Sequence, residues 1–207
     1  MAKLHVATLS PSKPELLTRW LADDPHVGDR VAGGVEVLGA YRFDDPAGEV
    51  GLECHLLGCG DGTVLHVPVS YRAAAEPSLA EHLLGTLEHS VLGTRWVYDA
   101  CADPVFLGEL LRTMHTGGTQ VELVVHTDDG PVIREPNAEV TGTGSAQAGP
   151  AIESVTMARH AQGATVRVGT ASVEVRRVLD LQERSVDGVA LLGTWTAQAE
   201  PVVLATT

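Results

Sequence analysis

Basic residues, and lysine above all, are scarce in this sequence of 207 residues. It contains 14 Lys plus Arg against 27 Asp plus Glu, which gives a formal net charge of −13. Lys3 and Lys13 are the two lysines. Nucleic-acid binding depends on clustered cations that neutralise phosphates, and here the cations are scattered without a basic stripe. The composition therefore argues against a nucleic-acid partner, and the dispersed acidic residues favour solubility.

Long apolar runs and cysteine motifs are missing as well. No run of 18 apolar residues occurs, so we expect no membrane partner, and Lys3 and His5 interrupt any apolar core of a signal peptide. Cys54, Cys59 and Cys101 form no CxxC motif. A bridge between Cys54 and Cys59 stays open, but reduced thiols in a cytoplasmic protein are the favoured interpretation.

The sequence also lacks the patterns of the common metal, cofactor and nucleophile sites. Its nine histidines include no HExxH or His-x-His motif. No serine lies in a GxSxG setting, and no helix pattern follows Gly142-Thr-Gly144 to make a phosphate loop. We therefore expect no metal, no cofactor and no catalytic residue of a recognised type.

The densest run of specific residue types extends over residues 88–104. Its middle part alternates in character and predicts a short strand, with Trp96 and Tyr98 on one face and Arg95 and Asp99 on the other. This stretch leads directly into a helix pattern, so polar side chains gather where a strand meets a helix.

The helix pattern has clear ends. Asp103 is a good N-cap because its carboxylate can accept from free amides, and Pro104 suits the first helical position. Apolar residues then recur at helical spacing, and Gly117 ends the pattern.

Two interpretations of the polar stretch stay open. In the functional one it forms a site or signature made of Glu88, His89, Arg95, Trp96, Tyr98, Asp99 and Asp103. In the structural one, Arg95 and Asp99 form an ion pair that pins the strand to the helix, and His89 is a satisfied turn residue. Structural ion pairs are common, so the structural interpretation is favoured.

The rest of the first 134 residues predicts helices and an antiparallel sheet. A capping box at Ser12 and Glu15 starts an amphipathic helix. Trp20 in this helix is expected in the core, with a stacking surface as the alternative. Strand-like runs follow at 35–43, 49–57 and 63–71, and the last of these alternates as if one face were buried.

Residues 135–151 are rich in Gly, Ser, Thr, Ala and Pro, which predicts a linker between two domains. Residues 152–207 are almost wholly strand-like and predict a small antiparallel β subdomain that packs against residues 1–134. The predicted fold class is therefore α+β.

Three runs resemble a known family: Val67-Pro-Val-Ser-Tyr-Arg72, Leu84 to Asp99, and Asp103-Pro-Val105. They resemble the N-terminal cap domain of actinobacterial maltokinases, and more closely its short stand-alone relatives, some of which are named 1,4-alpha-glucan branching proteins. The resemblance covers roughly residues 4–127. It implies a cystatin-like curved antiparallel sheet with helices. The Trp-Tyr/Phe-x-Gly-Lys-type segment of that family is replaced here by Asp24-Pro-His-Val-Gly-Asp29.

The resemblance also implies what the C-terminal part has lost. Residues 159–165 fall where the family has its nucleotide loop, and 172–179 where it has the strand with a phosphate-contacting lysine. The loop motif is gone and no lysine follows Lys13. Phosphoryl transfer needs that lysine together with a catalytic Asp and magnesium ligands. A branching enzyme needs a carboxylate pair on a barrel of about 200 residues or more. We expect a degenerate, truncated kinase N-lobe without catalysis.

Three hypotheses follow. The first is a non-catalytic interaction or regulatory protein that docks on an enzyme of maltose, trehalose or glycogen metabolism. The second is a small-ligand or glucan-binding module that uses the concave face of the sheet, with Trp96, Tyr98 or Trp20 as stacking surfaces. The third is an enzyme of unrecognised type around His89, Arg95 and Asp99, which would require these side chains to converge in an open pocket.

Overall fold

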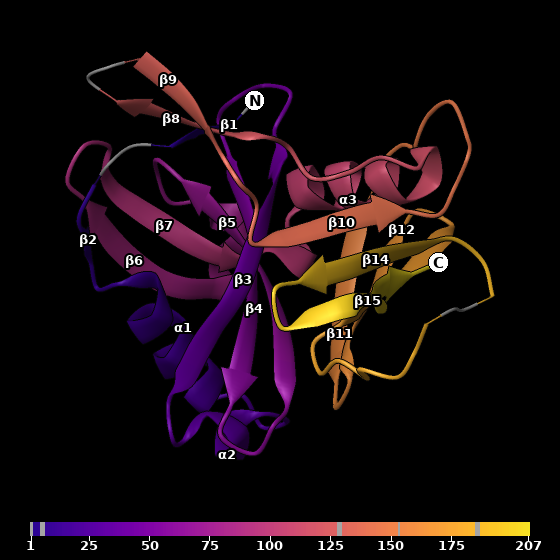
Figure 1. Cartoon of the computed structure of the whole chain (residues 1–207), viewed down its shortest axis with the longest axis horizontal. Helices are drawn as coiled ribbons and strands as arrows, with labels where there is room; N and C mark the ends of the chain where they lie inside the picture. Colours follow the sequence, from indigo (N-terminus) through magenta and orange to yellow (C-terminus); the bar gives the residue numbers. More distant parts are fainter. Residues whose placement is uncertain (1, 5–6, 128–129, 153, 185–186) are drawn as a thin grey trace.

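The computed structural model describes residues 2–4, 7–127, 130–152, 154–184 and 187–207. Its α+β architecture combines a curled antiparallel sheet, a second antiparallel sheet and a helix between them (Figure 1). The predicted fold class is confirmed.

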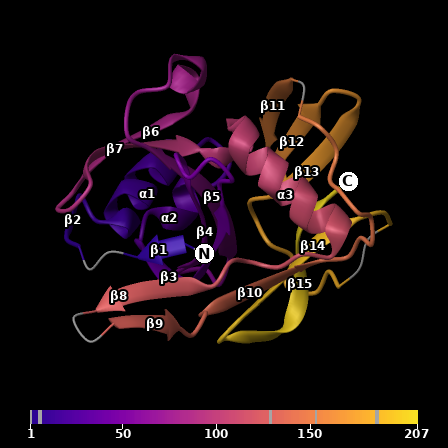
Figure 2. The ribbon, with the colours of Figure 1, turned by 90° about the horizontal axis from the view of Figure 1, so that it is seen from above.

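The first sheet has the strand order β2-β6-β7-β5-β4-β3 and is antiparallel at each pairing. It curls around helices α1 (Lys13–Ala22) and α2 (Gly28–Val31), which lie inside the curl in Figure 2. Its strands are β2 (Leu9–Ser10), β3 (Val35–Asp44), β4 (Gly51–Cys59), β5 (Val64–Arg72), β6 (Leu83–His89) and β7 (Gly93–Asp99).

Helix α1 forms as the capping pattern predicts. The Ser12 hydroxyl accepts from the Glu15 amide, and the Glu15 carboxylate accepts from the Ser12 amide at 2.8 Å. The buried face of the helix packs in the curl against Val67, Val69 and Val97. One end of the concave face is thereby filled with apolar side chains.

The second sheet has the order β10-β14-β15-β13-β12-β11. Simple hairpins join β11 to β12 and β12 to β13, so the region that falls where the family has its nucleotide loop is a tight turn between paired strands. The strands are β10 (Ala138–Gly142), β11 (Val155–His160), β12 (Gly163–Val168), β13 (Ala171–Arg176), β14 (Ala190–Trp195) and β15 (Gln198–Thr206).

Helix α3 (Pro104–Thr116) lies between the two sheets (Figures 1 and 2). Asp103 caps it, with its carboxylate 3.0 Å from the Val105 amide, and Gly117 ends it at φ 67°. Both ends are as predicted. Two short 3₁₀ helices, η1 (Pro77–His82) and η2 (Ala100–Ala102), flank β6 and β7.

A third, three-stranded sheet lies beside the first. Its strands are β1 (Ala2–Leu4), β8 (Leu123–Thr127) and β9 (Gly130–Arg134), and β1 pairs with β8 in parallel. The sequence also predicts one strand from Leu4 to Leu9. Residues 5–6 lie outside the described residues, and Ala7 and Thr8 are not in a strand, so Leu4 ends β1 and Leu9 begins the separate strand β2.

The central strands of the curled sheet are buried on both faces. In β5, Val67 and Val69 pack on α1, while Val64 and His66 on the other face are also buried. The prediction of one buried face was wrong because α3 and the second sheet cover the convex side. Pro68 lies where one edge of β5 changes partner, from the bridge between Leu65 and Val178 to the pairing with β7 that begins at Val69. Proline has no amide hydrogen to donate, and none is required at this position.

The linker prediction is corrected for residues 138–142, which form β10 and pair with β14. The glycines that suggested a flexible segment instead allow close packing on α3. A Cβ added at Gly142 would lie 2.0 Å from the Thr113 carbonyl oxygen, and one at Gly144 would lie 2.2 Å from that of His115. The division into domains at 1–134 and 152–207 stays a prediction, although one hydrophobic core contains residues from Tyr41 to Ala205.

All three cysteines are buried and free, and Cys54 and Cys59 lie on the same strand, β4. Within the described ranges, no helix is long and apolar enough to cross a membrane.

Candidate functional site

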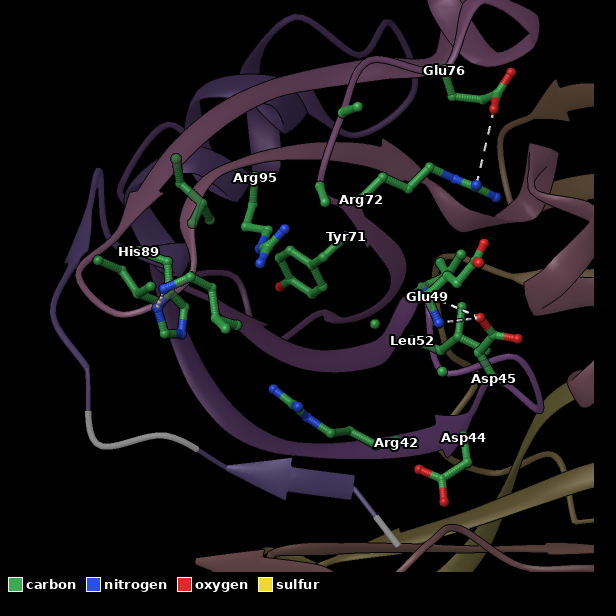
Figure 3. A pocket seen from close by; sticks show the side chains of 18 of the residues that line it. Arg42, Asp44, Asp45, Glu49, Leu52, Tyr71, Arg72, Glu76, His89 and Arg95 are labelled. Carbon is green, nitrogen blue, oxygen red and sulfur yellow. Dashed lines mark hydrogen bonds and ion pairs between the residues drawn. The ribbon is translucent and has the colours of Figure 1, made fainter. Parts of the chain in front are cut away.

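The curl of the first sheet encloses a cavity of about 980 Å³ beside the end of α1 (Figure 3). Helix α1 fills one part of the concave face, and the cavity occupies the part that the helix leaves open. We call this space the sheet cavity. Its lining includes Lys13, Arg42, Glu49, Tyr71, His89 and Arg95.

Strand register places these side chains on the same face. Tyr71 of β5 lies opposite Gly51 of β4 and Val97 of β7, and Arg42 of β3 lies opposite Glu53. Side chains alternate along a strand, so Arg95, two residues before Val97, shares the concave face. Gly51 leaves room in the middle of the floor, because it has no side chain.

Glu53 anchors the cations below the cavity. Its carboxylate lies 3.2 Å from an Arg42 nitrogen and 3.5 Å from His55 Nε2, and it also pairs with Lys13. Burial alone would raise the pKa of this carboxyl, but the charges of His55, Arg42 and Lys13 outweigh that effect and hold the pKa well below its usual range. Glu53 therefore stays ionised and fixes two cations at the cavity.

Arg95 is the unpaired cation of this wall. It is half-buried and lines the cavity, yet its side chain makes no hydrogen bond or ion pair with any residue that the structure describes. In Figure 3 its side chain and that of Arg42 reach toward the same space beside Tyr71. The guanidinium group is thus available to a ligand.

His89 closes the cavity at the β6–β7 turn. Its Nδ1 accepts from the amides of Val91 and Leu92, at 3.2 and 3.1 Å. The ring proton of the neutral form must then be on Nε2. The prediction that His89 is a satisfied turn residue is confirmed.

Carboxylates lie on the opposite side of the cavity. Asp45 accepts from the amides of Ala47, Glu49 and Val50, which fixes the β3–β4 turn. The Glu49 carboxylate makes no hydrogen bond or ion pair with a described residue. Figure 3 shows both groups across the cavity from Arg95, so the two sides differ in charge.

Asp99 does not line the cavity, and the predicted Arg95–Asp99 ion pair was wrong. Asp99 is fully buried and pairs with Arg159 at 2.8 Å and Arg177 at 3.0 Å. The two guanidinium groups lie 5.0 and 5.1 Å from the centre of the Trp20 ring. Burial alone would raise the Asp99 pKa, but Arg177 and Arg159 hold it below its usual value.

Trp20 is therefore partly buried and covered by cations. Neither interpretation of this residue, core or stacking surface, anticipated that contact. Arg159 also lies 3.7 Å from Asp24, so the cluster joins the end of α1 to the second sheet. Its arrangement is that of a structural connection.

The other predicted site residues do not line the cavity. Tyr98 is buried and its hydroxyl accepts from the Glu76 amide at 2.8 Å, so it offers no stacking surface. Trp96 is half-buried beside it on the convex face. Asp103 is fully buried and pairs with Arg72 at 2.8 Å. Glu88 is exposed and accepts from the Thr94 hydroxyl.

The structure thus brings His89 and Arg95 to one cavity and leaves Asp99 outside it. The hypothesis of an enzyme built on these three residues loses its geometric basis. Among the described lining residues there is no serine, threonine or cysteine that could act as a nucleophile. Among all the residues that the structure describes, no group of three or more His, Cys, Asp and Glu side chains could hold a metal ion.

Sequence reasoning missed the residues that complete the cavity. Arg42 and Glu53 are single charged residues inside otherwise apolar strands. Charged side chains are rarely buried without a partner, so each of these residues could have indicated a buried ion pair. Lys13 was noted only as one of two lysines. Tyr71 belongs to a run that carries the family resemblance, and it ends the strand pattern 63–71 that predicts one buried face.

A family model described as the maltokinase N-terminal cap domain matches residues 17–103. This segment extends from α1 to the N-cap of α3, so it includes most of the curled sheet and most of the cavity lining. The resemblance predicted from the sequence is confirmed: this part of the chain is similar to that cap domain. No curated protein matches the chain.

Proposed function

We propose that this protein is a non-catalytic regulatory protein of α-glucan metabolism that binds a small ligand in the sheet cavity. One observation carries the proposal. The cavity of about 980 Å³ lies in the part of the sheet that matches a maltokinase cap, and it holds unpaired polar side chains. Ligand sites are typically concave, largely preformed and lined by a few well-placed polar groups.

The side chains of the cavity favour binding over catalysis. Lys13 and Arg42 are held by the buried carboxylate of Glu53, and the Nδ1 atom of His89 is occupied by two backbone amides. No described lining residue is a serine, threonine or cysteine, the hydroxyl and thiol residues that act as nucleophiles in many covalent mechanisms. Fixed donors and acceptors of this kind suit recognition of a polar ligand.

The metabolic connection comes from the cap resemblance. A protein similar to a maltokinase cap supports a role near maltose, trehalose or glycogen. Stacking of a glucan on aromatic rings has little support, because Tyr98 is buried and Trp20 lies under two arginines. A mono- or disaccharide-sized ligand inside the cavity fits better than a polysaccharide on the surface.

Calorimetric titration tests this proposal. The wild-type protein would be titrated with maltose, trehalose, a maltooligosaccharide, glucose 1-phosphate and ATP with magnesium. Gly51→Phe should obstruct the floor of the cavity, because a Cβ there meets nothing closer than Tyr71 Cβ at 3.4 Å and the ring would project inward. We expect binding of at least one sugar compound to wild type and its loss in the variant.

The matched control is Gly60→Phe, at a turn glycine where an added Cβ meets nothing within 4 Å. It should keep wild-type binding, and circular dichroism should show that both variants are folded. If no compound binds, or if the Gly51→Phe variant binds as well as wild type, the cavity is not the ligand site.

A docking role is the second candidate, and one observation favours it. Val91 and Leu92 at the β6–β7 turn are 56% and 43% exposed beside the cavity mouth. Such apolar side chains at the rim would suit contact with an enzyme of α-glucan or trehalose metabolism. Pull-down from a native lysate should recover that enzyme with wild type and lose it with Val91→Asp. Equal recovery with both would remove this surface from consideration.

A further inference from the structure

We infer that the sheet cavity is selective for an anionic group carried on a hydroxylated body, such as a hexose phosphate, and that Arg95 is its main anion contact. This inference rests on the proposed function, because it names the ligand class of the same cavity. It is carried by the arrangement of charges inside the cavity and by the absence of a partner for Arg95 within the described structure.

The cationic side of the cavity has excess positive charge. Lys13, Arg42 and Arg95 line it, and the buried carboxylate of Glu53 pairs with the first two only. Arg95 remains without a partner among the described residues, although it is half-buried and aimed into the space beside Tyr71 (Figure 3). The protein as a whole has a formal net charge of −13, so a guanidinium group without a charge partner inside a cavity differs in sign from the rest of the molecule.

An anion is the ligand that such a group fits best. The guanidinium presents several N–H donors in a rigid plane that matches the oxygens of phosphate or carboxylate. At the start of α1, the capping box already takes up the amides of Ser12 and Glu15. Among the described residues, the side chain of Arg95 is the donor group without a partner that the cavity offers to an anion.

The opposite side of the cavity selects the rest of the ligand. The Glu49 carboxylate is without a partner among described residues and would repel a second anionic group. Carboxylates accept hydrogen bonds from hydroxyls, so a sugar ring with its hydroxyls on this side is compatible. The cavity volume of about 980 Å³ exceeds what a phosphate ion needs and leaves room for a sugar.

Titration with three probes separates the parts of this inference. Glucose 1-phosphate should bind more tightly than glucose and more tightly than inorganic phosphate. Arg95→Met should weaken glucose 1-phosphate binding by about 10- to 100-fold, the loss expected for a charge-assisted hydrogen bond. Because Arg95 has no partner to leave unpaired, this variant should fold like wild type. Added salt should weaken binding to wild type more than to the variant.

Two further variants sharpen the test. Arg167→Met removes an exposed arginine on β12 in the second sheet and should bind like wild type. Glu49→Gln should weaken binding of glucose 1-phosphate and leave binding of inorganic phosphate unchanged.

Each contrary result has its own meaning. Equal affinity of glucose 1-phosphate for wild type and Arg95→Met overturns the role of Arg95. Inorganic phosphate that binds as tightly as the sugar phosphate overturns the role of the hydroxylated body. Neutral sugars that bind as tightly as glucose 1-phosphate overturn this inference but leave the proposed function standing. If no probe binds at all, this inference falls, and binding of none of the proposed sugar compounds would remove the proposed function too.

Discussion

At the scale of single residues, His66 forms a hydrogen-bonded link between the two sheets. Its Nε2 lies 2.8 Å from the Tyr41 hydroxyl, and its Nδ1 lies 3.0 Å from the carbonyl oxygen of Arg176, which requires a proton on Nδ1. Burial lowers the pKa of this ring to about 3. His66 is thus a neutral structural histidine that cannot be charged without disturbing the contact between the sheets.

This histidine should make the protein sensitive to mild acid. In the unfolded chain the pKa of this histidine is about 6.5, so the unfolded state binds a proton there below that pH. The folded state binds the same proton only near pH 3. The free energy of unfolding should then fall by up to about 1.4 kcal/mol per pH unit as pH decreases through this window.

Urea unfolding at pH 6.0, 5.5 and 5.0 measures that slope. In His66→Gln the free energy of unfolding should depend less steeply on pH, by up to about 1.4 kcal/mol per pH unit. The variant His26→Gln, at an exposed position, should keep the wild-type pH dependence. An unchanged slope in His66→Gln would mean that this ring is charged in the folded protein.

Asp99 is the second residue whose role can be tested alone. It is the shared counter-ion of Arg159 and the buried Arg177, so Asp99→Asn would leave Arg177 without its charge partner and Arg159 with Asp24 alone. Breaking a buried pair in this way costs about 3–5 kcal/mol. Urea unfolding should show that loss, while Asp29→Asn at an exposed position should change stability by less than about 0.5 kcal/mol. A small effect at Asp99 would show that solvent reaches the cluster.

At the scale of elements, glycines let the segment after β10 lie against α3. A Cβ at Gly144 would lie 2.2 Å from the His115 carbonyl oxygen and 2.6 Å from its Cα, and backbone atoms cannot give way cheaply. Gly144→Ala should therefore lower the free energy of unfolding by about 1–3 kcal/mol or more.

Gly60→Ala is the matched control, since its Cβ would meet nothing within 4 Å. It should change stability by less than about 0.5 kcal/mol. Thermal and urea unfolding measure both variants. If Gly144→Ala proved as stable as Gly60→Ala, the segment would have to move freely over α3, as the linker prediction implied.

The helices could be predicted from sequence because their signals are local. Ser12 with Glu15, and Asp103 with Pro104, lie within a few residues of the amides they cap. The burial of both faces of β5 could not be predicted, because α3 and the second sheet provide the cover from distant parts of the chain. A short Gly-rich segment likewise looks flexible until its packing partner is known.

The same reason explains the candidate site. His89 and Arg95 lie near one turn, and the sequence placed them together. The true partners of Asp99 lie 60 and 78 residues further along, at Arg159 and Arg177, and nothing near Asp99 pointed to them. Arg42 and Tyr71 reach the cavity only through strand register, which no local pattern determines.

At the scale of the whole molecule, one core joins the first sheet, α3 and the second sheet. It contains Phe43 and Leu52 from the curled sheet, Phe106 from α3, and Val166 and Val202 from the second sheet. The buried Asp99 cluster and His66 cross the same boundary. We therefore expect one cooperative unfolding transition for the two predicted domains.

Tryptophan fluorescence and far-UV circular dichroism should report the same urea midpoint. Val202→Ala in the second sheet and Val67→Ala in the first should each shift that single transition, by about 0.5–2 kcal/mol. Two separated transitions, with each variant affecting one of them, would establish two independent domains and contradict a shared core.

The most direct test of the central claim is an NMR titration that observes arginine Nε–Hε signals while glucose 1-phosphate is added. The account predicts that the signals of Arg95 and Arg42 shift together and saturate, while the signal of Arg167 stays in place. If the signals of Arg95 and Arg42 do not move, or if the shifts occur only outside the sheet cavity, the claim that this cavity is the ligand site is contradicted.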